Sequence, residues 1–206
     1  MNETQVDGAA ARAPGLPPEQ GSGTAARTGL RAARESDGDA LGQFVTSLSL
    51  RSRYFRFFAG VPRVTAAMLR RMTGIRASAG EYVDALVAVE DGDIIGHGMA
   101  SDTRNADGTT VTEIGVVVAD ARQRHGVGSA LTRALATRAQ ARGATVLIMD
   151  VLAENHDMLT LLTHHFPAAQ SRHAGSCVTV HVPLPLIQED QPRDCALRQR
   201  QLAGTG

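Results

Sequence analysis

Lysine and tryptophan are both absent from this chain of 206 residues, and all 21 of its basic residues are arginine. Without lysine there is no side-chain amine, and a Walker phosphate-binding loop is excluded because its motif requires lysine. The 21 acidic residues bring the formal net charge to +0. The chain as a whole therefore has no charge-driven attraction to nucleic acid or to a membrane surface, and we expect neither as a partner.

Cysteine is scarce as well. Cys177 and Cys195 have no CxxC spacing and the histidines form no HExxH pattern, so the sequence predicts neither a disulfide framework nor a metal site. No run of about 18 apolar residues is present, which excludes a membrane-spanning helix. The N-terminal residues lack the apolar core of a secretory signal. We expect a cytoplasmic protein.

The composition divides the chain into three parts. In residues 1–27 the apolar side chains larger than alanine are Met1, Val6 and Leu16. Ordering a residue costs about 1–2 kcal/mol in backbone entropy, whereas burying these side chains returns at most about 3 kcal/mol each. We therefore expect a disordered arm at 1–27, one folded domain at 28–187 and a polar tail at 188–206.

Hydrophobic periodicity within 28–187 predicts alternating strands and helices. Strands are expected at 30–34, 85–89, 94–100, 111–118, 145–151 and 177–182, and helices at 37–48, from Pro62, at 128–142 and at 155–165. Glu90-Asp91-Gly92-Asp93 is a hairpin turn signal. The nearly continuous apolar run 145–151 is typical of a strand buried on both faces. This order predicts an α/β or α+β sandwich with a mixed sheet.

The most informative segment joins the strand 111–118 to the helix that follows it. Its loop reads Gln123-Arg124-His125-Gly126-Val127-Gly128-Ser129. The glycines let the backbone approach a ligand closely, and the N–H groups and dipole of a first helical turn favour an anion such as a phosphate. A Rossmann fingerprint is excluded, because Leu131 stands where its third glycine belongs.

The loop fits the pattern Q/R-x-x-G-x-G/A and resembles the pyrophosphate loop of the GNAT superfamily of N-acetyltransferases, which bind acetyl-CoA. The resemblance covers residues 28–185. It implies a mixed, mostly antiparallel sheet flanked by helices, in which two parallel strands, 113–118 and 145–151, splay apart around the pantetheine arm. The cofactor contacts that it implies come from Val116, Val117, Val118, Gln123, Arg124, His125, Gly126, Val127, Gly128, Ser129 and Asn155. Asn155 is equally well explained as the N-cap of the last helix, and both roles can coexist.

A narrower resemblance lies upstream. Residues 49–58, Ser49-Leu-Arg-Ser-Arg-Tyr-Phe-Arg-Phe-Phe, are similar to a stretch of bacterial protein-lysine acetyltransferases that act on acyl-CoA synthetases. We expect Phe55 and Phe58 to face the core at the end of the first helical region. Arg53 and Arg56 could instead line the acceptor side of the site.

Acetyl transfer to an amine requires a neutral nucleophile, and a lysine with a pKa near 10.4 costs about 4.6 kcal/mol to deprotonate at pH 7. Glu113, inside a Val/Ile strand, is the candidate general base and matches a Glu that the same subgroup places there. The alternative is a strand-end Glu that faces solvent. We expect Asp120 to cap its loop and Asp150 to be structural.

The family's usual general acid is a Tyr seven residues after its Asn, and Leu162 stands there in this chain. The thiolate is then protonated by water or by the substrate ammonium, or leaves unprotonated, and His164 and His165 are expected at the helix end. The sequence thus predicts an acetyl-CoA-dependent N-acetyltransferase acting on a protein lysine, for example of an acyl-CoA synthetase. A small-amine acetyltransferase, with an amino acid or antibiotic as acceptor, and a non-catalytic acyl-CoA-binding sensor are the alternatives.

Overall fold

The computed structural model describes residues 28–59, 63–74 and 82–186, and the expected arm at 1–27 and tail at 188–206 lie outside them. The described residues form a seven-stranded sheet in the order β1-β2-β3-β4-β5-β7-β6. Every neighbouring pair is antiparallel except β4 and β5, which are parallel. The expected mixed, mostly antiparallel sheet is confirmed. The strands are β1 Thr28–Ala32, β2 Tyr82–Glu90, β3 Asp93–Arg104, β4 Thr110–Val118, β5 Val146–Leu152, β6 Gln170–Ala174 and β7 Cys177–Pro183.

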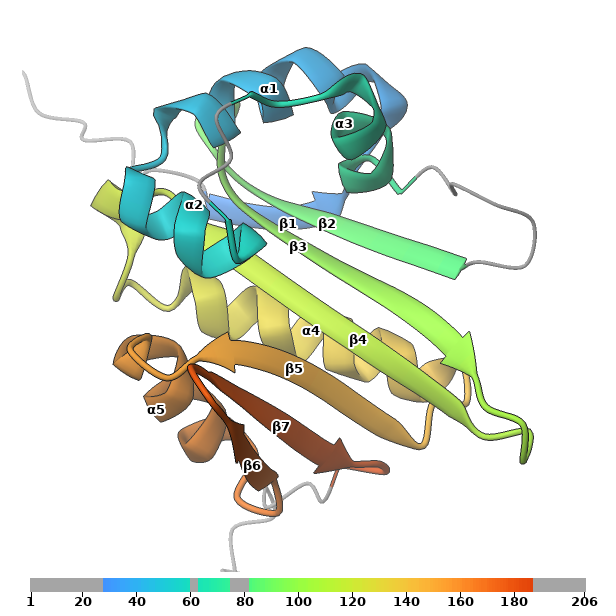
Figure 1. Cartoon of the computed structure of the whole chain (residues 1–206). Coiled ribbons are helices and arrows are strands. Elements are labelled where there is room, and N and C mark those ends of the chain that lie inside the picture. The colour runs from blue at the N-terminus through green and yellow to red at the C-terminus, as the bar shows by residue number, and fades with distance from the viewer. Residues whose placement is uncertain (1–27, 60–62, 75–81, 187–206) are drawn as a thin grey trace, which may run out of the picture.

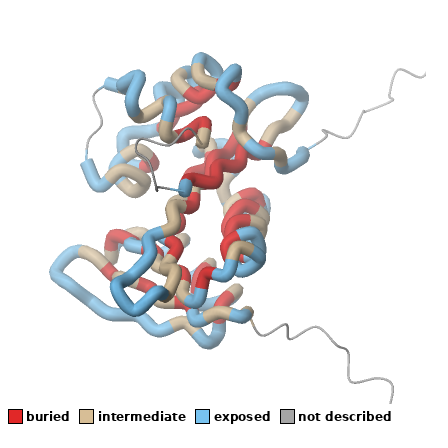
Figure 2. The backbone as a smooth tube through the Cα atoms, turned by 90° about the vertical axis from the view of Figure 1, so that its right-hand side faces the viewer, coloured by how far each residue is buried: buried red, intermediate tan, exposed pale blue. Residues whose placement is uncertain are grey.

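Helices cover both faces of the sheet (Figure 1). They are α1 Gly38–Ser47, α2 Leu50–Phe57, α3 Ala66–Met72, α4 Val127–Ala141 and α5 His156–His165, with short 3₁₀ turns at Glu35–Asp37 and Asp120–Arg122. One core cluster joins α1 and α3 to one face of β2 and β4, and a larger cluster joins α4 and α5 to the opposite face of the sheet. Buried positions gather where the helices meet the sheet (Figure 2). No helix in the described ranges is long and apolar enough to cross a membrane.

Close packing of α4 on the sheet depends on two glycines of β3. A Cβ atom at Gly98 would lie 2.8 Å from Leu135 Cδ1, and one at Gly96 would lie 3.1 Å from Leu131 Cδ1. Both leucines are fully buried. The missing side chains therefore let the apolar stripe of α4 rest directly on the strand.

Three features differ from the sequence-based expectations. The region before β2 contains three helices instead of two, because the Ser49 hydroxyl accepts a hydrogen bond from the Ser52 N–H and starts α2 separately. The next helix begins after its N-cap Thr65, and Pro62 lies outside the described residues. The sequence also missed β6, whose five residues are all exposed and give no apolar alternation.

The strand β5 is buried on one face only. Leu147, Met149 and Val151 are buried, whereas Ile148 is half-buried and Asp150 is exposed. The expectation of a strand covered on both faces was therefore wrong. The apolar run could not reveal that the neighbouring strand turns away from β5.

Candidate functional site

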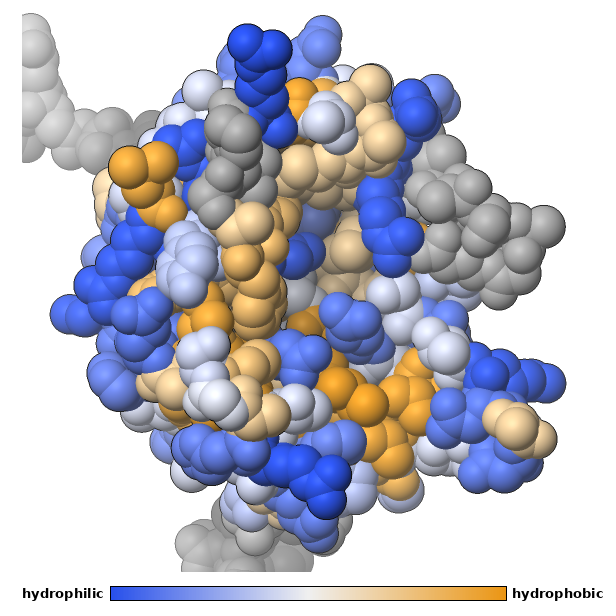
Figure 3. All heavy atoms as spheres, viewed as in Figure 1, coloured by the Kyte–Doolittle hydropathy of each residue, from blue (hydrophilic) through white to orange (hydrophobic). Residues whose placement is uncertain are grey.

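The parallel strands β4 and β5 stay together over a short seam. Their register pairs Val111 with Val146 and ends at Glu113 with Ile148, although both strands continue for several residues. A cleft of about 790 Å³ opens beyond this point. In the space-filling view the surface beside α2 is hollowed, with polar and apolar side chains together in the hollow (Figure 3). The two strands thus splay as expected.

The exposed edge of β4 offers backbone groups to this cleft. The Ala119 N–H donates to the Ile95 carbonyl of β3 at 2.9 Å. Because backbone groups alternate in direction along a strand, those of Val117 also face β3, whereas those of Val116 and Val118 face β5. Gln123 Nε2 donates to the Val118 carbonyl at 3.1 Å. The N–H groups of Val116 and Val118 and the Val116 carbonyl therefore require partners from a ligand or water.

Among Val116, Val117 and Val118, only Val117 has its backbone groups turned toward β3. Its side chain is buried in the cluster that packs against α1, although the residue also borders the cleft. It can contribute an apolar wall but no backbone hydrogen bond to a ligand in the opening.

The N-terminus of α4 lies at the wide end of the cleft. Its N-cap Gly126 has a φ of +82°, which favours glycine, and no side chain within the described residues caps the helix. The N–H groups of Val127, Gly128 and Ser129 consequently have no intrahelical acceptors. This first turn can bind an anion such as the pyrophosphate of a nucleotide cofactor.

Other residues of the loop have individual roles. Arg124 is exposed and pairs with Asp157 of α5 at 3.1 Å, beside the cleft. The His125 ring turns back to the Gln123 carbonyl at 2.7 Å, and the Val127 side chain is buried against the sheet. Neither His125 nor Val127 is among the residues that line the cleft. Any contact from Val127 has to come from its backbone.

A hydrogen-bonded clamp joins α2 to the loop after β4. Asp120 accepts from the Ser49 N–H at 2.9 Å and from the hydroxyls of Ser49 and Ser52, both at 2.7 Å. Gln123 Nε2 also donates to Ser52 Oγ at 3.0 Å. Burial raises the pKa of Asp120, but these hydrogen bonds outweigh it, so the pKa lies below its ordinary value. Asp120 was expected to cap its own loop, but its carboxylate binds Ser49 and Ser52 at the start of α2 instead.

Glu113 occupies the closed end of the cleft. It is exposed, lines the cleft and is the last residue of β4 that pairs with β5. Within the described ranges no hydrogen bond or ion pair engages its carboxylate. An unengaged carboxylate at this position is available to accept a proton from a substrate.

The aromatic residues of α2 do not lie as expected. Phe55 and Phe58 line the cleft, and Phe58 is exposed, whereas Phe57 packs against the core. The helix turns Phe57 toward the core and Phe55 toward another side, and Phe58 is the C-cap, whose left-handed backbone leaves the helical path. The expectation of core positions for Phe55 and Phe58 was wrong. Arg56 lines the cleft, and Arg53 is not among its lining residues.

The helix α5 forms the opposite wall. Asn155 Oδ1 accepts from the Met158 N–H at 3.3 Å, which confirms its N-cap role, and the residue also borders the cleft. Leu162 is 1% exposed and belongs to the core, so that position supplies no acid. His164 and His165 end the helix as expected and border the cleft. Burial lowers the pKa of His165, as do the charges of Arg133 and His164.

Asp150 has a structural partner. Its Oδ1 accepts a hydrogen bond from Thr179 Oγ1 at 2.6 Å, which ties β5 to β7. In the part of the chain that the structure describes, no group of three or more His, Cys, Asp or Glu side chains is placed to hold a metal ion.

Comparison with known proteins agrees with this geometry. The model of the acetyltransferase (GNAT) family matches residues 49–166. The GNAT domain of S. lividans PAT is 27% identical, with a TM-score of 0.64 over 75% of this chain and 89% of that one. A GNAT-family acetyltransferase from Streptococcus pneumoniae is 20% identical, with a TM-score of 0.60 over 75% and 97%.

Arabidopsis thaliana NAA60 in complex with acetyl-CoA is 14% identical and has the same fold, with a TM-score of 0.55 over 78% of this chain and 99% of that one. No curated protein matches the chain. The family model covers more than half of the sequence. The chain belongs to the acetyltransferase (GNAT) family, whose members carry out acetyl-CoA-dependent N-acetylation.

Proposed function

We propose that this acetyltransferase transfers its acetyl group to a lysine of another protein, with Glu113 as the general base. The observation that carries the proposal is the exposed, unengaged Glu113 carboxylate at the point where β4 and β5 part. A base at this point meets an amine that enters beside the thioester end of a cofactor lying in the splay.

Acetyl-CoA supplies an activated thioester, and the chain supplies its binding and the proton acceptor. The first turn of α4, at Val127, Gly128 and Ser129, would hold the pyrophosphate. The backbone N–H groups of Val116 and Val118 and the Val116 carbonyl, which face the cleft, would form hydrogen bonds with the pantetheine amides. Glu113 accepts the proton of the acceptor ammonium, directly or through one water, which leaves the neutral amine that attacks. With Leu162 in the core, the departing thiolate takes its proton from water or substrate.

A protein acceptor is supported by the surface of α2 next to the cleft. Leu50 and Tyr54 lie four residues apart on this helix and Phe58 is its C-cap, and the three are 75%, 38% and 43% exposed. Such a stripe of exposed apolar side chains suits contact with a protein surface better than contact with water. The likeness to the S. lividans PAT domain and to the residue 49–58 stretch of protein-lysine acetyltransferases supports the same acceptor, an acyl-CoA synthetase being the first to test.

The test of the base is Glu113→Gln, which keeps the size of the side chain and removes its charge. We expect turnover to fall by about 10²- to 10⁴-fold, while acetyl-CoA affinity measured by calorimetry stays within about twofold. Glu35→Gln is the matched control and should keep full activity, because Glu35 is exposed on the turn before α1 and does not line the cleft. Normal turnover of Glu113→Gln at pH 7 would show that Glu113 is structural.

A further inference from the structure

The guanidinium of Arg56 lies flat against the backbone of β4. A Cβ atom at Gly115 would be 2.8 Å from Arg56 Cζ, 2.9 Å from Nη1 and 3.0 Å from Nη2. The three nearly equal distances show that the plane of the group faces the strand. Glycine at this position makes room for the guanidinium, since any side chain would collide with it. The group also lies over the Phe57 ring, with Cζ 5.2 Å from the ring centroid.

Within the described residues no carboxylate forms an ion pair with this cation, although the charge of Glu113 raises its pKa. Arg56 Nε is buried and makes no hydrogen bond to any residue that the structure describes. Among residues 28–59, 63–74 and 82–186, none forms a hydrogen bond or ion pair with the rest of the guanidinium, which borders the cleft. Burial lowers the pKa of Arg56 to about 10, the charge of Glu113 partly offsets this, and Arg71 lowers it further. Arg56 is therefore still charged at pH 7, and a buried charge without a partner is costly.

Arg56 and Glu113 face the same side of β4. Glu113 and Gly115 are two residues apart in a strand, so their side-chain positions share a face. The two charged groups border one cleft but form no ion pair with each other. An ammonium that approaches Glu113 consequently also approaches Arg56, which repels it unless a negative group lies between them.

We propose that Arg56 binds a carboxylate that the acceptor carries close to its reacting amine. The inference rests on the proposed function only in that the amine enters on the Glu113 side. The planar fork of a guanidinium matches a carboxylate with two parallel hydrogen bonds. The carboxylate has two sources, an acidic residue beside the target lysine of a protein and the α-carboxylate of a free amino acid.

The experiment compares matched acceptors with three forms of the protein. The acceptors are lysine-centred peptides flanked by Asp or Glu, the same peptides with Asn or Gln, free lysine and lysinamide. The variants are Arg56→Gln, which removes the charge, and Gly115→Ala, which keeps the charge but displaces the guanidinium. Arg70→Gln, an exposed arginine of α3 outside the cleft, is the control. Melting temperature and acetyl-CoA affinity are measured for each variant.

We expect the wild type and Arg70→Gln to prefer the carboxylate-bearing member of at least one pair. In Arg56→Gln and Gly115→Ala the KM for that member should rise by about 10- to 100-fold, the loss expected for a charge-assisted hydrogen-bonded pair. The KM for the neutral member should change little. If Arg56→Gln fails to fold, Gly115→Ala decides the question.

Equal use of carboxylate and neutral acceptors by the wild type would overturn the inference and leave the protein-lysine function standing. Use of free lysine alone, dependent on Arg56, would support the inference and overturn the protein acceptor. A preference that persists in both variants overturns the role of Arg56. Succinyl-CoA is the last probe, because an Arg56-dependent preference for it over acetyl-CoA, without any acceptor preference, would assign the carboxylate to the acyl donor and overturn the inference.

Discussion

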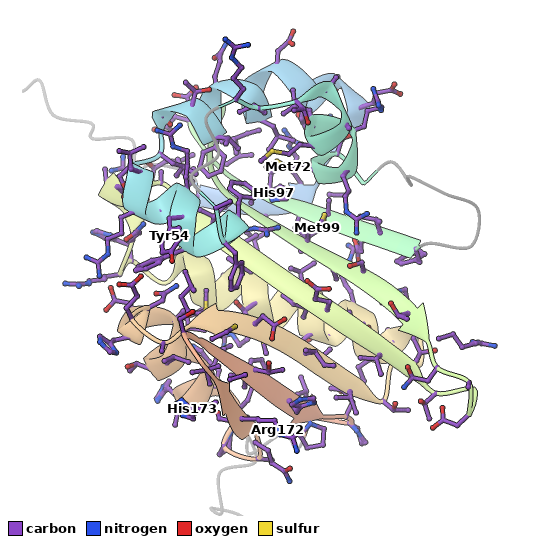
Figure 4. The ribbon with its side chains drawn as sticks, in the orientation of Figure 1. Tyr54, Met72, His97, Met99, Arg172 and His173 are labelled. Carbon is purple, nitrogen blue, oxygen red and sulfur yellow. The ribbon has the colours of Figure 1, made fainter. Side chains whose placement is uncertain are left out.

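At the scale of single residues, His97 is the most unusual titratable group outside the cleft. It lies fully buried on β3 between Met72 and Met99 (Figure 4). Its Nε2 is 2.9 Å from the Met72 carbonyl, so this nitrogen carries the proton and donates it, and Nδ1 has no hydrogen-bond partner among the described residues. Burial lowers the pKa of His97 to about 3, the charge of Arg56 lowers it as well, and the Met72 carbonyl raises it. His97 is therefore neutral in the folded protein.

The depressed pKa of His97 predicts a loss of stability in acid. Between about pH 6.5 and pH 3 the unfolded chain binds a proton at this residue and the folded chain does not. Stability contributed by neutral His97 is thus present above pH 6.5 and declines by about 1.4 kcal/mol per pH unit below it.

His97→Gln retains a donor for Met72 and does not titrate. Urea denaturation at pH 7, 6 and 5 measures the free energy of unfolding of wild type and of His97→Gln. As the pH falls below 6.5, wild type should lose stability relative to His97→Gln by about 1.4 kcal/mol per pH unit. A difference that stays constant would contradict the value of the pKa.

At the scale of elements, α4 is anchored to the sheet at its C-terminal end by buried charges. Asp84 accepts from Arg138 Nε at 2.7 Å and from Arg142 Nη1 at 2.8 Å, and Asp102 accepts from Arg142 Nε at 2.9 Å. Asp84 is buried, whereas Asp157 in the pair with Arg124 at the other end of the helix is exposed. The same kind of interaction therefore differs in burial between the two ends.

This difference predicts different costs for two similar substitutions. Asp84→Ala leaves two arginines without their buried partner and should lower the free energy of unfolding by about 3 kcal/mol. Asp157→Ala removes a solvated pair and should cost less than about 1 kcal/mol. Urea denaturation of both variants measures the contrast. Equal costs would show that Asp84 does not anchor the helix.

The elements found from sequence are those with a strong local signal. The β-branched run of β4 and the apolar stripe of α4 gave both elements to within one residue of their ends. The Asp91-Gly92 turn gave the β2–β3 hairpin, whose strands extend three residues further at the start of β2 and four at the end of β3 than expected. The strand β6 lacks such a signal, because its residues are polar on both sides. The break between α1 and α2 depends on one Ser N-cap, which is a weak pattern without knowledge of its neighbours.

The candidate site divides in the same way. Glu113 and the loop at Gly126 could be predicted because their pattern is contiguous in sequence. The contact of Arg56 with Gly115 and the clamp of Ser49 to Asp120 could not, since they join segments about 60 to 70 residues apart. Such contacts follow from how α2 packs on the sheet, which periodicity does not determine.

At the scale of the whole molecule, the absence of lysine predicts that the enzyme does not acetylate its own side chains, and this can be tested directly. A chain without side-chain amines can accept acetyl only at its N-terminal amine. Incubation with radiolabelled acetyl-CoA and a host lysate should label discrete other proteins and leave the band of the enzyme blank, apart from any N-terminal signal. Mass spectrometry of the enzyme after the reaction checks the same point.

The distribution of label also separates the candidate functions. Label confined to small molecules would contradict the protein acceptor. No label, despite measured acetyl-CoA binding, would favour a sensor that has lost turnover.

The separation of β4 from β5 also predicts a pattern of amide hydrogen-exchange rates along β4. Along the last part of β4, the N–H groups of Gly115 and Val117 face β3, and those of Val116 and Val118 face the opening. In deuterated water the ligand-free protein should show alternating slow and fast amide exchange from one residue to the next. Saturating acetyl-CoA should slow Val116 and Val118 and leave their neighbours unchanged, as two-dimensional NMR can record. Uniform amide exchange rates along β4 in the ligand-free protein would mean that the cleft between β4 and β5 closes in solution. Because the last part of β4 is paired with β3 on one edge and open to the cleft on the other, amide exchange at Val116 and Val118 reports whether the cleft is occupied.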